Sequence, residues 1–252
     1  MRKQDAFTLI ELLVVIAVIA LLMGILMPSL NLAKAQAQKV VCTAHMKSLG
    51  VSLRMYVDDN DGKTHRSPNN GLWDNAWEQT SVVKDYDQDH DYAYWGIAYY
   101  PYSKNKKIFR CPSTKRVDDW PEWGWGVTYQ RYFKYCSYGI NGYITWNSAE
   151  QRNVKIDHDF KRLDEVIAFQ DHIEQKLDGN GDMSYIRSGE NTNLTQWRNG
   201  GTLGDFPEAV QECYRHRGVS MTCWLDGHVS GIEESTGEDV PKHWYTGVRE
   251  DL

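Results

Sequence analysis

The chain has 252 residues, of which 41% are apolar and 25% charged, a balance typical of a folded globular protein rather than a disordered one. The net charge of −6 and the absence of a dominant basic patch argue against nucleic acid as a partner. The mean hydropathy of −0.59 excludes a multi-span membrane protein. Nearly all of the continuous apolar sequence lies in the first 27 residues, which indicates one membrane anchor before a water-soluble body.

The N-terminal segment predicts a membrane-spanning helix over residues 7–27. As an α-helix this stretch is about 31 Å long, which matches the apolar core of a bilayer. Arg2 and Lys3 precede the apolar run, and no charged residue follows it before Lys34. The positive-inside rule therefore places the N-terminus in the cytoplasm and the body outside.

Glu11 interrupts this apolar segment. A carboxylate at the bilayer centre costs on the order of 2.5–3.5 kcal/mol, and less near the ends of the span. A counter-charge becomes available if the chain is cut before Phe7, because the new α-amino group is a cation at the membrane edge. Pairing of Glu11 with that group on a neighbouring copy would favour lateral assembly.

Three interpretations of the segment stay open from these residues. The first is a simple signal anchor that tolerates Glu11. The second is a secretory signal peptide cut near residues 33–35 or 35–37, although the apolar stretch is longer than the usual 7–15-residue core of such peptides. The third is a processed assembly segment, and it rests on a family resemblance.

The segment Ala6-Phe-Thr-Leu-Ile-Glu11-Leu-Leu-Val-Val-Ile16 resembles the processing and methylation site of type IV prepilins and type II secretion pseudopilins. The resemblance implies that a prepilin peptidase removes a leader of residues 1–6, cuts between Ala6 and Phe7, and methylates Phe7. It also implies that Glu11 guides subunit docking and that Pro28 is the helix-kinking proline of the family. The family prefers glycine where Ala6 stands, which puts the rate of processing in question.

After Pro28 the pattern becomes amphipathic. Apolar residues recur at helical spacing over residues 28–57, with lysine, glutamine and arginine between them. We therefore expect one helix from Thr8 to Val57, kinked rather than ended by Pro28. The run from Asp58 to Gly62 is a stop signal. The apolar stripe would pack on its own globular domain, residues 58–252, or also on neighbouring subunits.

The globular domain predicts an antiparallel sheet. The candidate strands are Tyr92–Tyr99, Tyr138–Thr145, Val166–Gln170, Val219–Leu225 and His228–Ile232. Asp226-Gly227 predicts a type I′ hairpin turn. Residues 73–91 and part of 157–206 are expected to be loop insertions. The predicted fold class is thus α+β, and the resemblance makes it pilin-like: a long N-terminal helix, membrane-spanning in its first half, packed on the sheet.

Four further motifs, one in the amphipathic helix and three in the body, extend the resemblance. They are Cys42-Thr-Ala-His-Met-Lys-Ser-Leu-Gly50, Phe109-Arg-Cys-Pro-Ser113, Ser137-Tyr-Gly-Ile-Asn-Gly-Tyr143, and His216 followed after nine residues by Asp226-Gly227. In this order they resemble the pseudopilin-like group that carries a C-terminal H-X9-DG domain. The resemblance implies architecture more directly than activity.

Two metal hypotheses come from the body. A hairpin would bring His216, Asp226 and His228 near one another as zinc ligands, and the alternative is that they orient turns or lie exposed. Asp178, Asn180 and Asp182 alternate as in the start of a calcium loop, but Met183 stands where an EF-hand has glycine. A calcium site of another type and a solvated turn both stay open, and no other cofactor is expected.

Cysteine and tryptophan supply two further hypotheses. Five cysteines in an exported body suggest disulfides, and Cys42 with Cys111 would staple the helix to the body. The cluster of Trp120, Trp123 and Trp125 is either a packed group or a platform for sugars.

The leading hypothesis is therefore a structural subunit of a type IV pilus-like filament or a type II secretion pseudopilus, acting in protein export. Its partners would be prepilin peptidase, other pilin subunits, the assembly platform and the inner membrane, with the body periplasmic or extracellular. No catalytic motif such as a nucleophile elbow, a phosphate loop or H-E-x-x-H is present, so no enzyme activity is expected. The alternative is a membrane-tethered carbohydrate-binding protein.

Overall fold

The structure is a computed structural model that describes residues 8–65, 95–115, 137–147, 150, 152–172, 176–177, 211–234, 241 and 243–248. The α-helices are α1 (Leu9–Asp59), α4 (Trp95–Ser103), α5 (Ile156–Asp159) and α8 (His243–Thr246). The 3₁₀ helices are η1 (Lys106–Phe109), η4 (Gly142–Ile144) and η5 (Leu163–Glu165). The strands are β1 (Tyr138–Asn141), β2 (Trp146–Asn147), β3 (Arg152–Asn153), β4 (Ile167–Asp171), β5 (Lys176–Leu177), β6 (Val219–Trp224) and β7 (Val229–Glu233).

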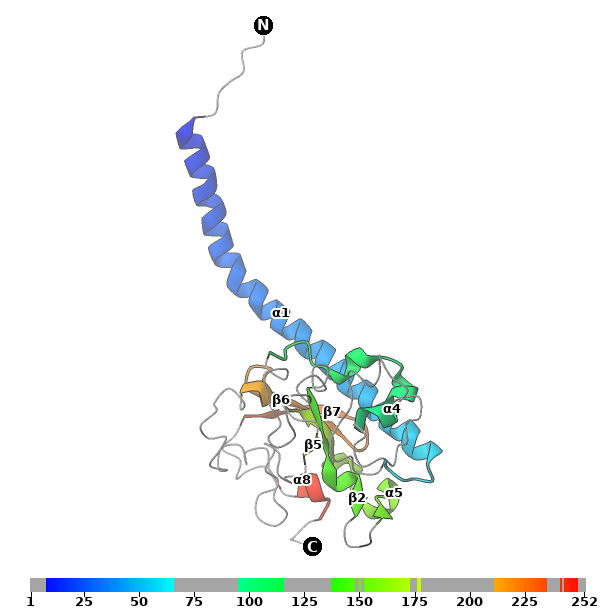
Figure 1. Ribbon diagram of the computed structural model, residues 1–252. Helices are drawn as coiled ribbons and strands as arrows, with labels where there is room; N and C mark the ends of the chain where they lie inside the picture. The colour runs from blue at the N-terminus through cyan, green and yellow to red at the C-terminus, as the bar shows by residue number, and fades with distance from the viewer. Residues whose placement is uncertain are drawn as a thin grey trace, which may run out of the picture.

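The long N-terminal helix is confirmed as α1, which runs through Pro28 without a break. Figure 1 shows the first half of α1 projecting away from the body and the second half lying against it. The predicted stop signal ends the helix. The Asn60 side chain donates to Tyr56 O (2.8 Å), and the Gly62 N–H donates to Val57 O (2.9 Å) with a φ of +78° that favours glycine.

The body is built on a five-stranded sheet in the order β5-β1-β4-β6-β7. All neighbouring strands are antiparallel except β5, which pairs parallel to β1. The second half of α1 packs against β4, β6 and β7, and α4 packs on α1. The α+β fold is thus as predicted. Its core lies between one face of the sheet and the part of α1 that follows Pro28, which we call the stalk.

The first predicted strand, Tyr92–Tyr99, is wrong. Residues 92–94 lie outside the described residues, and from Trp95 the chain is the helix α4. Ala98 and Tyr99 are buried, and Tyr102, one helical turn after them, is partly buried against the core. A short apolar run of this kind suits a buried strand as well as a buried helix, and packing on α1 selects the helix.

Two other strand predictions need smaller corrections. The predicted strand Tyr138–Thr145 ends as β1 at Asn141, because the Asn141 side chain accepts from Tyr143 N (3.0 Å) and begins η4. The β6–β7 hairpin is confirmed, but its turn is not type I′. Only Gly227 of the Asp226-Gly227 pair has a positive φ (+84°). Trp224 N–H donates to His228 O (3.0 Å), so the three residues 225–227 form the loop, and such loops need one left-handed residue rather than two.

Candidate functional site

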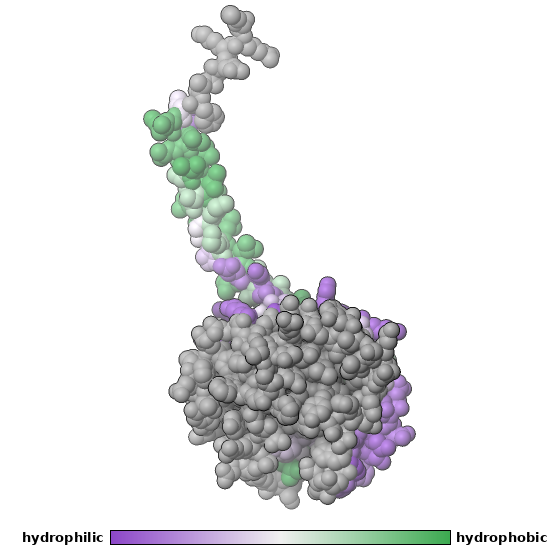
Figure 2. Space-filling view, in the orientation of Figure 1, coloured by the Kyte–Doolittle hydropathy of each residue, from purple (hydrophilic) through white to green (hydrophobic). Residues whose placement is uncertain are grey.

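The projecting half of α1 exposes a continuous apolar surface. Its large apolar side chains between Leu9 and Met27 are 46% to 79% exposed, and Figure 2 shows the hydrophobic colour along this part of the helix. Within the described residues, α1 is the one helix long and apolar enough to cross a membrane. Such a surface is far larger than a soluble protein leaves in water, so a bilayer or other helices must cover it.

Glu11 closes a capping box at the start of this helix. Its carboxylate oxygen Oε2 accepts from the backbone N–H and the hydroxyl of Thr8 (both 2.8 Å), and the Glu11 N–H donates to Thr8 Oγ1 (3.3 Å). Both donors to the carboxylate are uncharged. Among the described residues Glu11 therefore has hydrogen bonds but no counter-charge. The predicted cut between Ala6 and Phe7 lies outside the described residues.

The second half of α1 meets the β6–β7 hairpin turn at Asp226-Gly227. Lys47 Nζ donates to Gly227 O (2.6 Å). At Gly50 a side-chain carbon would lie 2.8 Å from Cys223 Sγ and 3.5 Å from Gly227 Cα. Gly50 thus lets α1 approach β6 and the turn closely, so the Cys42–Gly50 motif and the Asp226-Gly227 motif form one contact between the stalk and the body.

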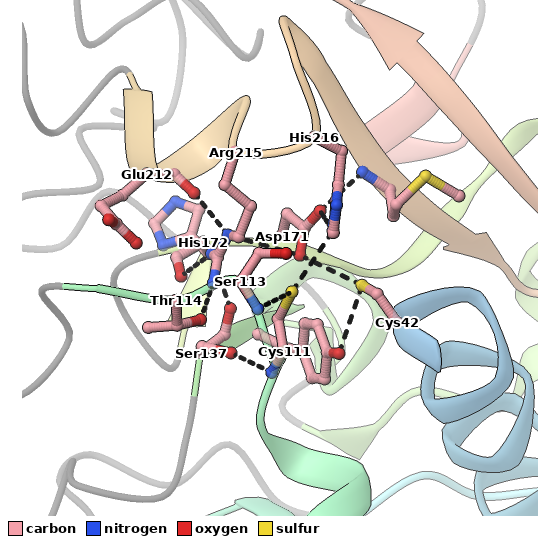
Figure 3. A network of polar contacts seen from close by, with 12 residues as sticks. Cys42, Cys111, Ser113, Thr114, Ser137, Asp171, His172, Glu212, Arg215 and His216 are labelled. Carbon is pink, nitrogen blue, oxygen red and sulfur yellow. Dashed lines mark hydrogen bonds and ion pairs between the residues drawn. The ribbon is translucent and has the colours of Figure 1, made fainter. Parts of the chain in front are cut away.

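A second contact is a buried cluster of four potential metal ligands, shown in Figure 3. Cys42 comes from α1, Cys111 follows η1, Asp171 ends β4, and His216 precedes β6. Cys111 Sγ lies 3.3 Å from His216 Nε2, and His216 Nε2 lies 3.4 Å from Asp171 Oδ2. Cys42 Sγ donates to Asp171 Oδ1 at 3.6 Å. All four ligand atoms lie within 4.8 Å of one another.

Neighbouring groups hold this cluster in place. Asp171 Oδ2 accepts from Met221 N (2.8 Å), and its Oδ1 lies 3.6 Å from Arg215 Nε. The guanidinium of Arg215 is buried and donates to Ser137 O (2.9 Å) and His172 O (2.6 Å). The sulfur atoms are held as well, by Tyr138 OH donating to Cys42 Sγ (3.3 Å) and Ser113 N donating to Cys111 Sγ (3.4 Å).

The two thiols are electrostatically different. Burial acts to raise the pKa of Cys111, but hydrogen bonds with Cys42 and His216 outweigh it and lower that pKa to about 4. Burial, followed by the hydrogen bond to Cys111, raises the pKa of Cys42. Burial also raises the pKa of Asp171 to about 7, against the attraction of Arg215. Cys111 is therefore the more acidic thiol of the pair, and a thiolate is the form that binds metals.

The predicted zinc trio of His216, Asp226 and His228 is wrong in its geometry. The six residues of β6 separate His216 from the turn, about 20 Å at strand rise. Asp226 Oδ1 instead accepts from the backbone N–H of His228 (2.9 Å) and lies 2.7 Å from its ring Nδ1. These two residues shape the turn, and His216 belongs to the buried cluster at the other end of the strand.

The predicted disulfide partners are brought together, but both are free thiols in the structure. Besides the contact between the two thiols, Cys42 Sγ contacts Asp171 and Cys111 Sγ contacts His216. Asp171 and Arg215 are functional candidates that the sequence alone did not predict. Two signals in the sequence could have pointed to them: Arg215 is adjacent to His216, and Asp171 ends a buried strand.

The calcium candidates Asp178, Asn180 and Asp182 and the tryptophans at 120, 123 and 125 lie outside the described residues.

Comparisons with known proteins point to the N-terminal part of the chain. Residues 1–27 match the family model described as "Prokaryotic N-terminal methylation motif". The chain is 44% identical over 64 residues to the type IV wide pilus major component PilA4 of Thermus thermophilus, a match that covers 25% of this chain and 49% of that relative. The chain thus spans about half of the length of the curated relative it matches. No solved structure matches it.

Proposed function

We propose that this chain, type IV pilin-like in its N-terminal motif and its fold, is a structural subunit of a pilus or pseudopilus that polymerises through α1. The proposal includes removal of residues 1–6 by a prepilin peptidase, methylation of Phe7, and a place in the inner membrane before assembly. It also includes a role in protein export through a type II secretion-like machine. The observation that carries it is the exposed apolar half of α1, with one acidic residue near its start.

The surface of α1 supports assembly on energetic grounds. Burial of a single large apolar side chain is worth about 1.5–3 kcal/mol. The side chains between Leu9 and Met27 are about half exposed or more, so the gain from covering them is large. Lipid would cover them in the membrane, and the same side chains would meet those of neighbouring α1 helices in a filament. The folded body at the other end of α1 would then line the outside of that filament.

In this proposal Glu11 sets the position of each subunit against its neighbour. Among the described residues, its carboxylate is hydrogen-bonded to the uncharged donors of Thr8 alone. In apolar surroundings a nearby cation is then strongly attractive, because Coulomb interactions grow as the dielectric constant falls. The α-amino group of a processed Phe7 on the adjoining subunit supplies that cation at the matching end of the helix.

Substitution of Glu11 by glutamine separates its two roles. Glutamine keeps the capping box, since S/T-x-x-E and S/T-x-x-Q both form it, but it removes the charge. We expect Glu11→Gln to retain membrane insertion and the folded body yet to lose incorporation into filaments, measured by shearing and sedimentation. Glu11→Ala, which also loses the cap, is the comparison variant.

Intact-mass measurement of the membrane-extracted protein tests the processing step. We expect the chain to begin at Phe7 and to carry one added methyl group. A product that begins at Met1, or beyond residue 33, contradicts the proposal. Normal filament incorporation of Glu11→Gln contradicts the charge-pairing step alone and leaves the processing result standing.

A further inference from the structure

We propose that Cys42, Cys111, Asp171 and His216 bind a zinc ion that fastens the stalk helix to the body. The four residues come from α1, the segment after η1, the end of β4 and the segment before β6, so no two belong to one element. They are all buried, and their ligand atoms lie within 4.8 Å of one another. Figure 3 shows their side chains converging on one point.

The distances fit a tetrahedral ion. Zinc binds thiolate sulfur at about 2.3 Å and imidazole nitrogen or carboxylate oxygen at about 2.0–2.2 Å, so the edges of its ligand tetrahedron are about 3.3–3.8 Å. Two distances match such edges directly, 3.3 Å from Cys111 Sγ to His216 Nε2 and 3.4 Å from His216 Nε2 to Asp171 Oδ2. Cys42 Sγ lies 3.6 Å from the other carboxylate oxygen, Oδ1, so a rotation of the carboxylate or of Cys42 brings one oxygen to both neighbours, and the four ligand atoms already lie within 4.8 Å of one another. An ion can therefore enter with small movements of the side chains.

The charges and the surrounding contacts also fit. Binding of zinc releases the proton that Cys42 donates to Asp171, and the two thiolates and one carboxylate then carry three negative charges, which a divalent ion and the buried guanidinium of Arg215 balance. Arg215 lies 3.6 Å from Asp171 Oδ1, and Met221 N donates to Asp171 Oδ2. Contacts of this kind orient the ligands in known metal sites. Soft sulfur and imidazole ligands favour zinc over calcium or magnesium.

A zinc site accounts for more of the cluster than a disulfide does. A Cys42–Cys111 disulfide would leave the convergence of His216 and Asp171 on the same two sulfurs without a role. Four protein ligands leave no open position, so the site is structural rather than catalytic. His216 also lines a cavity of about 650 Å³ between the stalk and the body, together with Gln38, Pro112 and Arg217.

The test uses the full-length chain, purified in detergent without chelator and analysed for metals by mass spectrometry. We expect about one zinc ion per chain. Cys111→Ser and His216→Ala should each reduce the zinc content at least about tenfold, because loss of even an outer-shell partner costs about 10–100-fold in metal affinity and these residues are ligands themselves. Cys223→Ser and His228→Ala are the matched controls, because these residues lie outside the cluster, and they should keep the zinc of the unmodified chain.

A second measurement does not depend on the folding of variants. The unmodified chain is stripped of metal with a chelator under reducing conditions and titrated with cobalt(II). We expect a thiolate-to-cobalt charge-transfer band, the absorption of a tetrahedral site, and a Tm about 5 °C or more above that of the stripped protein. Protein that holds no zinc and shows a Cys42–Cys111 disulfide by peptide mapping overturns the proposal, as does a cobalt spectrum without thiolate bands.

Discussion

Leu49 lies on the face of α1 that packs on the sheet and is fully buried. Leu49→Ala removes three carbon atoms from this contact. At about 0.8 kcal/mol for each buried methylene the transfer loss is roughly 2.4 kcal/mol, and the cavity left between helix and sheet brings the total to about 3–4 kcal/mol. For a domain of this size, each kcal/mol lowers the Tm by about 2–4 °C. We therefore expect the Tm to fall by about 6–16 °C.

The assay is thermal unfolding of the full chain in detergent, followed by tryptophan fluorescence, since helical circular dichroism would be dominated by the projecting apolar half of α1. Leu30→Ala is the matched control, because Leu30 is on the same helix but 67% exposed. Its Tm should change by about 1–2 °C at most. A Leu49→Ala Tm within that same margin would refute the packing of the stalk half of α1 on the sheet.

Two further predictions concern the stalk contact and acid stability. Gly50→Ala places a carbon 2.8 Å from Cys223 Sγ, so we expect about 1–3 kcal/mol of destabilisation in urea unfolding, and an unchanged midpoint would contradict the close approach. The pKa of Asp159 is lowered, first by its hydrogen bond with Arg152. Its stabilising contribution is therefore present above the unfolded pKa of about 3.9 and is lost as the pH falls through the lower folded pKa. We expect Asp159→Asn to be less stable than the unmodified chain at pH 7 and to lose less stability on acidification, measured as the urea midpoint against pH.

The elements that depend on local pattern could be predicted from the sequence. The 3.6-residue repeat and the stop signal after Val57 placed α1 to within two residues, and the Asp226-Gly227 turn placed the β6–β7 hairpin. Where the pattern was ambiguous, tertiary contacts decided the structure. The aromatic run before Ser103 became a helix because it packs on α1, and Asn141 ended a strand early by bonding to the backbone.

The buried cluster could be predicted only in part. His216 and Cys111 were marked by motifs, and Cys42 and Cys111 were paired as a hypothesis. Their convergence with Asp171 depends on the sheet order, which brings the end of β4 beside the start of β6. Contacts between residues 129 positions apart, such as Cys42 and Asp171, leave no local signal in the sequence. The predicted zinc trio was wrong for the opposite reason. His216 and Asp226 are close in sequence, but the extended strand β6 between them holds them far apart in space.

The continuity of α1 through Pro28 has a mechanical consequence. A single helix of 51 residues, about 77 Å long, joins the apolar span to the body without a hinge loop. A force along the helix axis, applied to the apolar half of α1, therefore reaches the body through the side of the helix. It loads all the buried contacts between the second half of α1 and the body in shear at the same time. A strand pulled from one end would instead peel away one hydrogen bond at a time. The architecture thus suits a molecule that must carry tension along its own long axis.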